Sequence, residues 1–193
     1  MVFDLVSLVL FLRCSIGLIF TPYKTMRKIS LESTWSECIW IFIFIVIYFF
    51  ITNTVHSWIN GLMGALCLYL ASVFFLSLLP AAGTYVERFK RVAITWSYTL
   101  LPTLIWFYST LLFFFLIPPP RTTSLLGKSF SIFYIAFSGS LFVWKIILAY
   151  LSIRFSLRVH LYRVIYYLLL YLALSIPLWV YFYTIGISRI PFV

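Results

Sequence analysis

Five long apolar runs, separated by short polar connections, constrain the fold more than any other feature of this sequence. Each run approaches the roughly 20 residues that a helix needs to cross the hydrocarbon core of a bilayer. The predicted spans are residues 36–53, 59–80, 92–117, 130–153 and 164–187. Because connections this short join neighbouring antiparallel helices, we expect an all-α, polytopic transmembrane bundle over residues 35–189.

The composition excludes the main alternatives to a membrane protein. Only 9% of the 193 residues are charged and 64% are hydrophobic, whereas an ordinary globular chain carries about 25% charged residues. A soluble domain of this size could not bury so much apolar surface. Disordered chains and secreted disulfide scaffolds are excluded on composition as well.

Residues 1–34 are interpreted as an amphipathic segment on the cytoplasmic side of the membrane. Residues 2–20 are apolar, but Asp4 and Arg13 interrupt them, and a charge near the middle of a span costs about 2.5–3.5 kcal/mol. We therefore expect this segment to lie at the interface. A sixth span over residues 2–20 is the alternative, and it would place the N-terminus outside.

The basic residues predict the orientation of the chain. The formal net charge is +10, which in a soluble protein would suggest nucleic acid. Here the Lys and Arg residues cluster between apolar runs, so they indicate topology, and we expect no nucleic-acid partner. The ten that share one side of the five-span arrangement are Arg13, Lys24, Arg27, Lys28, Arg88, Lys90, Arg91, Arg154, Arg158 and Arg163. The positive-inside rule makes that side cytoplasmic, with the N-terminus inside and the C-terminus outside.

Two of the cytoplasmic clusters are candidate binding sites for lipids or for partner proteins. Near a membrane surface each basic residue contributes about 1 kcal/mol to the attraction of anionic head groups. An acidic surface on a partner would be attracted in the same way. The clusters are Arg88, Lys90 and Arg91 ahead of the third span, and Arg154, Arg158 and Arg163 between the fourth and fifth.

Lys145 is the formal charge that lies well inside a predicted span. It is about eight residues, or roughly 12 Å, from the cytoplasmic end of that span. Its side chain could snorkel or pack inside the bundle, or it could line a polar pathway or contact a partner. The apolar runs, the first of them counted from Cys38 to Thr52, contain no Asp or Glu, so we expect no intramembrane carboxylate to pair with it.

Two prolines and two groups of small residues interrupt the spans. Pro102 and Pro177 lie in span interiors, where proline kinks a helix. Such kinks serve either as architecture or as gates. Gly61 and Ala65, and the run Ser138-Gly139-Ser140, permit close helix approach. That approach can occur within one chain or between two copies, so a homo-oligomer is an open alternative.

The sequence contains no recognisable catalytic or metal-binding set. An active site needs a nucleophile with a base, a metal cluster or paired carboxylates. None of the corresponding motifs is present, and the three cysteines are scattered without a CxxC pair. We expect a protein that is not an enzyme and that has no cofactor and no metal.

Two segments resemble the Yip-domain family of five-span membrane proteins. The first is residues 20–29, ahead of the first span. The second is residues 88–102, where Phe89-Lys90, Ser97-Tyr98 and Pro102 follow a Phe-Lys-x6-Gly-Tyr-x3-Pro pattern, with Ser97 in the place of glycine. The resemblance implies a five-span bundle with a cytoplasmic N-terminus, and a non-catalytic scaffold in the eukaryotic members. The Asp-Leu-Tyr-Gly-Pro motif and the long hydrophilic tail of those members are absent, which points to a bacterial-type member in a prokaryotic cytoplasmic membrane.

These observations lead to one leading hypothesis and one alternative. The leading hypothesis is an integral membrane scaffold or accessory subunit that binds other integral membrane proteins, membrane lipids or both within a larger assembly. The alternative is a small transporter or channel whose path runs near Lys145 and the kinks at Pro102 and Pro177.

Overall fold

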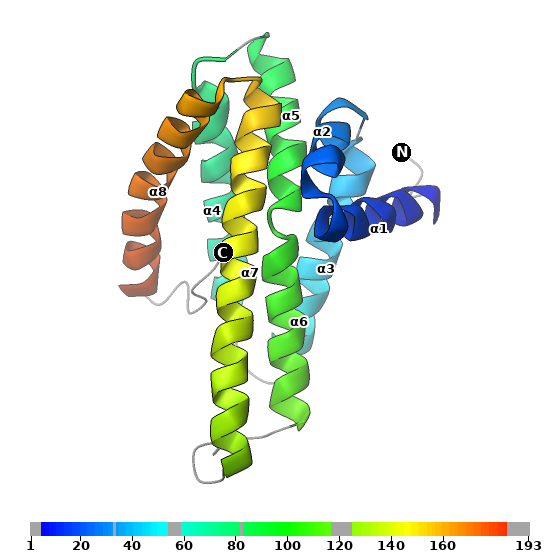
Figure 1. The fold of residues 1–193 in the computed structure, drawn as a ribbon, viewed down its shortest axis with the longest axis vertical. Helices are drawn as coiled ribbons and strands as arrows, with labels where there is room; N and C mark the ends of the chain where they lie inside the picture. Colours follow the sequence, from blue (N-terminus) through cyan, green and yellow to red (C-terminus); the bar gives the residue numbers. More distant parts are fainter. Residues whose placement is uncertain (1–4, 33, 54–58, 82, 117–124, 185–193) are drawn as a thin grey trace.

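The described part of the chain is entirely helical, which confirms the predicted all-α class. The computed structural model describes residues 5–32, 34–53, 59–81, 83–116 and 125–184. Within these ranges there are eight helices and no strand (Figure 1). They are α1 (Leu5–Phe20), α2 (Pro22–Glu32), α3 (Trp35–Asn53), α4 (Ile59–Leu78), α5 (Tyr85–Tyr98), α6 (Leu101–Leu116), α7 (Leu125–Leu157) and α8 (Leu161–Thr184).

The helices match the predicted spans only in part. Helices α3, α4, α7 and α8 cover the first, second, fourth and fifth spans, while α5 and α6 share the third; the predicted ends at 117 and 187 lie outside the described residues. By length and composition, Gly127–Leu157 in α7 and Leu161–Leu178 in α8 are long and apolar enough to cross a membrane. A third span results if α2 and α3 are counted as one bent pair. The chain is thus compatible with an integral membrane protein, and the count of five spans remains a prediction.

The predicted span over residues 92–117 is two helices, because the helix breaks at Thr99 and Leu100. The backbone N–H groups of these residues donate to the carbonyls three residues back, Trp96 (3.0 Å) and Ser97 (3.1 Å). Pro102 has no N–H to donate to the Tyr98 carbonyl, and its ring crowds that carbonyl. The prediction that Pro102 kinks the interior of one continuous helix is therefore wrong, since Pro102 is the second residue of α6.

Pro177 lies where the sequence predicted it, inside α8. A proline in a helix interior removes one backbone hydrogen bond. No interior proline occurs in α7, which runs for 33 residues from Leu125 to Leu157. This helix extends beyond the predicted span of 130–153 at both ends.

The N-terminal segment forms two helices of different character. In Figure 1, α1 (dark blue) runs crosswise to the long axes of α5 and α7. Its Val6, Val9 and Phe20 side chains are exposed, so α1 lacks a clear polar face. The amphipathic helix is instead α2, which buries Met26 and Ile29. The prediction of an amphipathic helix over residues 2–20 is therefore not confirmed.

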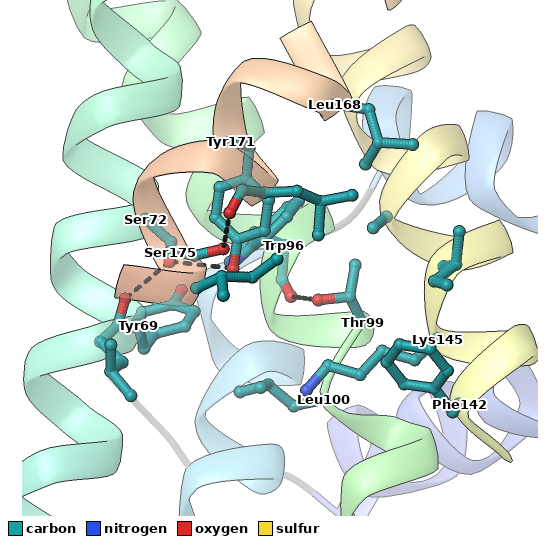
Figure 2. Close-up of a pocket in the computed structure, with 15 residues that line it drawn as sticks. Tyr69, Ser72, Trp96, Thr99, Leu100, Phe142, Lys145, Leu168, Tyr171 and Ser175 are labelled. Carbon is teal, nitrogen blue, oxygen red and sulfur yellow. Dashed lines mark hydrogen bonds between the residues drawn. The ribbon is translucent and has the colours of Figure 1, made fainter. Parts of the chain in front are cut away.

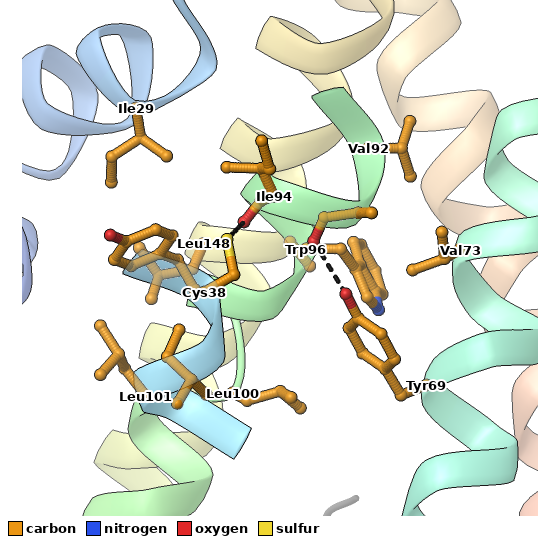
Figure 3. Packing of buried hydrophobic residues seen from close by; sticks show 14 of the residues in the cluster. Ile29, Cys38, Tyr69, Val73, Val92, Ile94, Trp96, Leu100, Leu101 and Leu148 are labelled. Atoms are coloured by element: carbon orange, nitrogen blue, oxygen red, sulfur yellow. Dashed lines mark hydrogen bonds between the residues drawn. The ribbon is translucent and has the colours of Figure 1, made fainter. Parts of the chain in front are cut away.

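Helices α5 and α6 pack against α7 through apolar side chains and a line of polar contacts. The apolar part is shown in Figure 3, where Val92, Trp96 and Leu148 belong to one buried cluster. Hydrogen bonds between side chains on facing helices stabilise such pairs in membranes by about 0.6–1.7 kcal/mol each. The four that cross this interface are Ser152 Oγ to Thr95 Oγ1 (2.9 Å), Lys145 Nζ to Thr103 Oγ1 (2.9 Å), Trp106 Nε1 to Ser138 Oγ (3.1 Å) and Thr110 Oγ1 with Tyr134 OH (2.5 Å).

A buried carboxylate at the start of α3 was not expected from the sequence. Glu37 is only 5% exposed. It accepts hydrogen bonds from the Tyr98 hydroxyl at 3.1 Å and from the Thr34 backbone N–H at 3.3 Å. Glu37 directly precedes the apolar run that begins at Cys38, and the expectation that no carboxylate pairs with Lys145 stays a prediction. An acidic residue at this place interacts favourably with the N-terminus of its helix, and Tyr98 makes its burial tolerable.

We predict that Tyr98→Phe lowers the free energy of unfolding by about 1.5–3 kcal/mol, because a hydrogen bond to a charged group contributes about that much. Denaturant unfolding of the purified protein in detergent micelles measures the change. The matched control is Tyr166→Phe, because Tyr166 is 62% exposed. Equal unfolding midpoints for the two variants would contradict the role given to Tyr98.

Candidate functional site

A cavity lies between α4, α5, α7 and α8. It has a volume of about 460 Å³, within the range of small-molecule binding sites. Figure 2 shows that Tyr69 and Ser72 approach it from α4, Trp96 from α5, Thr99 from the turn after α5, and Tyr171 from α8. Most of its remaining wall is apolar, formed by Leu68, Leu100, Phe142, Ile146, Ala149, Leu168, Leu172 and Ile176.

The polar groups of this cavity are already engaged with the protein. The Ser72 hydroxyl donates to the Leu68 carbonyl at 2.6 Å and lies 3.3 Å from the Tyr171 hydroxyl. The Tyr69 hydroxyl donates to the Ala93 carbonyl at 2.9 Å, and the Trp96 and Tyr171 rings meet edge to face at 4.9 Å. A mainly apolar wall with a few hydroxyls is suited to an apolar molecule that carries one or two hydrogen-bonding groups.

Lys145 lies in the wall of this cavity and packs against α6. Its Nζ donates to Thr103 Oγ1 at 2.9 Å. It stands 12 residues before Leu157, the end of α7, which is about 18 Å along the helix rather than the predicted 12 Å. Lys145 thus packs against α6 and also lines the cavity, so both of its predicted alternatives stay open. Pro102 and Lys145 line one small pocket together, and Ser175 and Ile176, next to Pro177, line the large cavity.

The two predicted basic clusters lie at the same end of the bundle. Arg88, Lys90 and Arg91 lie on the first turns of α5, while Arg154, Arg158 and Arg163 surround the turn from α7 to α8, at the top of Figure 1. Burial lowers the pKa of the Arg91 guanidinium, and the nearby charge of Arg158 lowers it further. The two clusters therefore form one basic surface.

A groove of about 350 Å³ between α2 and the end of α7 gathers three arginines. We call it the arginine groove; its lining residues are Tyr23, Arg27, Ser30, Leu31, Arg154, Phe155, Arg158 and Val159. Arg154 and Arg158 were predicted as site residues from the sequence, whereas Arg27 was not. The spacing of Tyr23, Arg27 and Ser30 does indicate that they share one face of a helix. The sequence did not predict which other helix packs against that face.

The described residues offer no metal centre. No group of three or more His, Cys, Asp or Glu side chains gathers anywhere in the described ranges. The buried Cys38 thiol instead donates to the Ile94 carbonyl at 3.8 Å (Figure 3). The expectations of no metal, no cofactor and no catalysis stay predictions.

Comparison with known proteins adds no functional assignment. No protein-family model matches the sequence, and no curated protein and no solved structure is significantly similar to it. The resemblance to the Yip-domain family therefore remains a prediction. The structure itself defines the class, an all-helical protein with two helices long and apolar enough to cross a membrane among the described residues.

We predict that Thr103→Val lowers the free energy of unfolding by about 0.6–1.7 kcal/mol, because it removes the hydroxyl that accepts the Lys145 hydrogen bond. Thermal unfolding in a lipid nanodisc measures the loss. Thr84→Val is the matched control, since Thr84 is exposed and its side chain makes no capping hydrogen bond. A Thr103→Val protein as stable as the control would show that the contact is energetically neutral.

Proposed function

We propose that this protein is a non-enzymatic integral membrane scaffold or accessory subunit that binds other integral membrane proteins and lipids within a larger assembly. The observation that carries the proposal is an exposed surface on α7 that no described segment covers. Helices that leave large apolar surfaces unburied within their own chain face either lipid or another protein in a membrane. A strip of small residues favours contact with another protein over contact with lipid, because it lets another helix approach closely.

The strip is centred on Gly139. A Cβ added at Gly139 would meet no described atom within 4 Å, so the chain itself does not use the space that this glycine leaves. Ala136, Ser140 and Val143 on the same face are exposed too. The sequence left open whether the small residues here pack within the chain or between chains. The open space beside Gly139 supports packing between chains, with a different membrane protein or a second copy.

The proposed setting is a prokaryotic cytoplasmic membrane, with the N-terminus inside and the C-terminus outside. The shared basic surface at one end of the bundle supports this orientation, because the positive-inside rule keeps such surfaces cytoplasmic. Lys128 is a basic residue near the other end of α7. A Yip-domain membership of the bacterial type is part of the same proposal and rests on the residues that resemble that family.

We predict that Gly139→Trp abolishes the co-purification of partner membrane proteins, because the bulky ring fills the strip that a partner helix would occupy. The measurement is affinity purification from gently solubilised native membranes, followed by native mass spectrometry. Leu169→Trp is the matched control, since Leu169 is a 61% exposed residue on α8. Wild-type protein that purifies with lipid alone would overturn the subunit role.

A second candidate function is supported by the cavity beside Lys145. A cavity of about 460 Å³ in the wall of a bundle, with a lysine and the segments around Pro102 and Pro177 near it, is where a transport path would be expected. Under this alternative the protein is a small transporter or channel.

The transport alternative predicts that Lys145→Met reduces solute flux into proteoliposomes by at least tenfold, because it removes the cation beside the path. Flux of ions, sugars and labelled lipids is measured side by side for both proteins. Lys128→Met, a change of the same kind near the end of α7, is the control. Absence of any flux by the wild-type protein would reject the alternative.

A further inference from the structure

We infer that the arginine groove is a binding site for the phosphate of an anionic lipid head group. The inference deepens the lipid-binding part of the proposed function and rests on it. Three guanidinium side chains, those of Arg27, Arg154 and Arg158, line one cavity of about 350 Å³, and no carboxylate is among its described lining residues. Like charges that converge in this way create a local positive potential that an anion relieves.

Two helices bring the three charges together. Helix α2 packs on the end of α7 through the Ser30 hydroxyl, which donates to the Phe155 carbonyl at 3.3 Å, and through the Tyr23 ring, which meets the Phe155 ring edge to face at 5.0 Å. Because these contacts fix the spacing of the helices, Arg27 stands opposite the α7 arginines. The groove is a property of the folded chain and not of one basic segment.

Arg154, in the last turn of α7, is held in place before any ligand binds. The Arg154 guanidinium lies over the Tyr23 ring at 5.4 Å and donates to the Tyr150 hydroxyl at 3.2 Å. Such positioning reduces the ordering cost of binding, and the remaining guanidinium donors can still meet a ligand. Arg158 has a φ of 53°, in the left-handed region that usually ends a helix with glycine. The chain therefore keeps an arginine at a position where backbone geometry favours glycine.

The acidic side chain on α2 does not neutralise the groove. Glu32 pairs with Lys28 at 3.6 Å, and neither residue lines the groove. Glu87, on α5, interacts with Arg91. Charge complementarity thus calls for an anion from outside the described chain.

The chemistry and the depth of the groove point to a lipid phosphate. Arginine presents a planar fork of donors that matches phosphate oxygens. Arg154 and Arg158 follow directly after the predicted end of the fourth span at residue 153, which places them at head-group level on the cytoplasmic side. Basic pockets between helices on that side are typical binding sites for anionic head groups.

The test uses the full-length protein in a zwitterionic detergent and titrates it with phosphatidylglycerol and phosphatidylcholine under native mass spectrometry. The double variant Arg27→Gln/Arg158→Gln is expected to bind phosphatidylglycerol about 30-fold more weakly than wild type, which corresponds to about 2 kcal/mol for two basic residues. Phosphatidylcholine binding should not change.

The matched control is Arg13→Gln/Lys24→Gln, which removes two exposed charges that lie outside the groove and outside both basic clusters. The affinity of this control for phosphatidylglycerol should stay within threefold of wild type. The variant Arg27→Lys/Arg158→Lys keeps the two positive charges but loses the planar guanidinium groups. Its affinity should lie between those of wild type and of Arg27→Gln/Arg158→Gln. Equal losses in both Gln variants would overturn the inference, because they would reflect general surface charge. Displacement of the lipid by millimolar inorganic phosphate would overturn the lipid assignment in favour of a soluble phosphate.

These results are separable from the test of the subunit role. Arg27→Gln/Arg158→Gln leaves the Gly139 surface intact, so it should retain partner proteins. Gly139→Trp leaves the groove intact, so it should retain phosphatidylglycerol. Unchanged phosphatidylglycerol affinity in the Arg27→Gln/Arg158→Gln variant, whatever Gly139→Trp does, would overturn the groove assignment.

Discussion

The contact of α5 and α6 with α7 is the interaction on which the rest of the described structure depends. Its hydrogen-bonded side-chain pairs run from Ser152 and Thr95 near the basic end to Tyr134 and Thr110 near the other. In a bilayer the hydrophobic effect gives helices little reason to associate, so polar contacts and close packing must hold them together. Helices α2, α4 and α8 then pack on this central pair, and both the cavity and the arginine groove lie where they do so.

The break between α5 and α6 divides the contact with α7 into two parts. A continuous helix would present its polar residues with one fixed period. On the two sides of the short turn at Thr99 and Leu100, Thr95 reaches α7 from α5 and Thr103 reaches it from α6. The hydroxyls of Ser97 and Thr99 donate to nearby carbonyls of their own chain at 2.7 Å, which satisfies polar groups that lipid could not.

Apolar runs and proline positions allowed the helical class and most helix locations to be predicted, since both act locally. The side-chain partners were not predictable, because they depend on which helices pack together. From the sequence, Glu37 is an ordinary acidic residue at the start of a helix. Its hydrogen bond with Tyr98, 61 positions later, becomes evident only in the folded structure. Arg27 reads as one of several cytoplasmic charges until α2 is folded onto α7. Lys145 was noticed for its charge, but its contact with Thr103 depends on how α6 packs against α7, which its neighbours along the chain do not determine.

The buried pair of Glu37 and Tyr98 also has a consequence for how the chain is made. During synthesis α3 leaves the ribosome well before α5, so Glu37 is exposed to the membrane environment without its tyrosine donor. A carboxylate in that position is costly in hydrocarbon. Under the integral membrane arrangement proposed above, we expect helix α3 to gain its final depth only after α5 docks, so that the order in which the helices are inserted becomes part of the folding pathway.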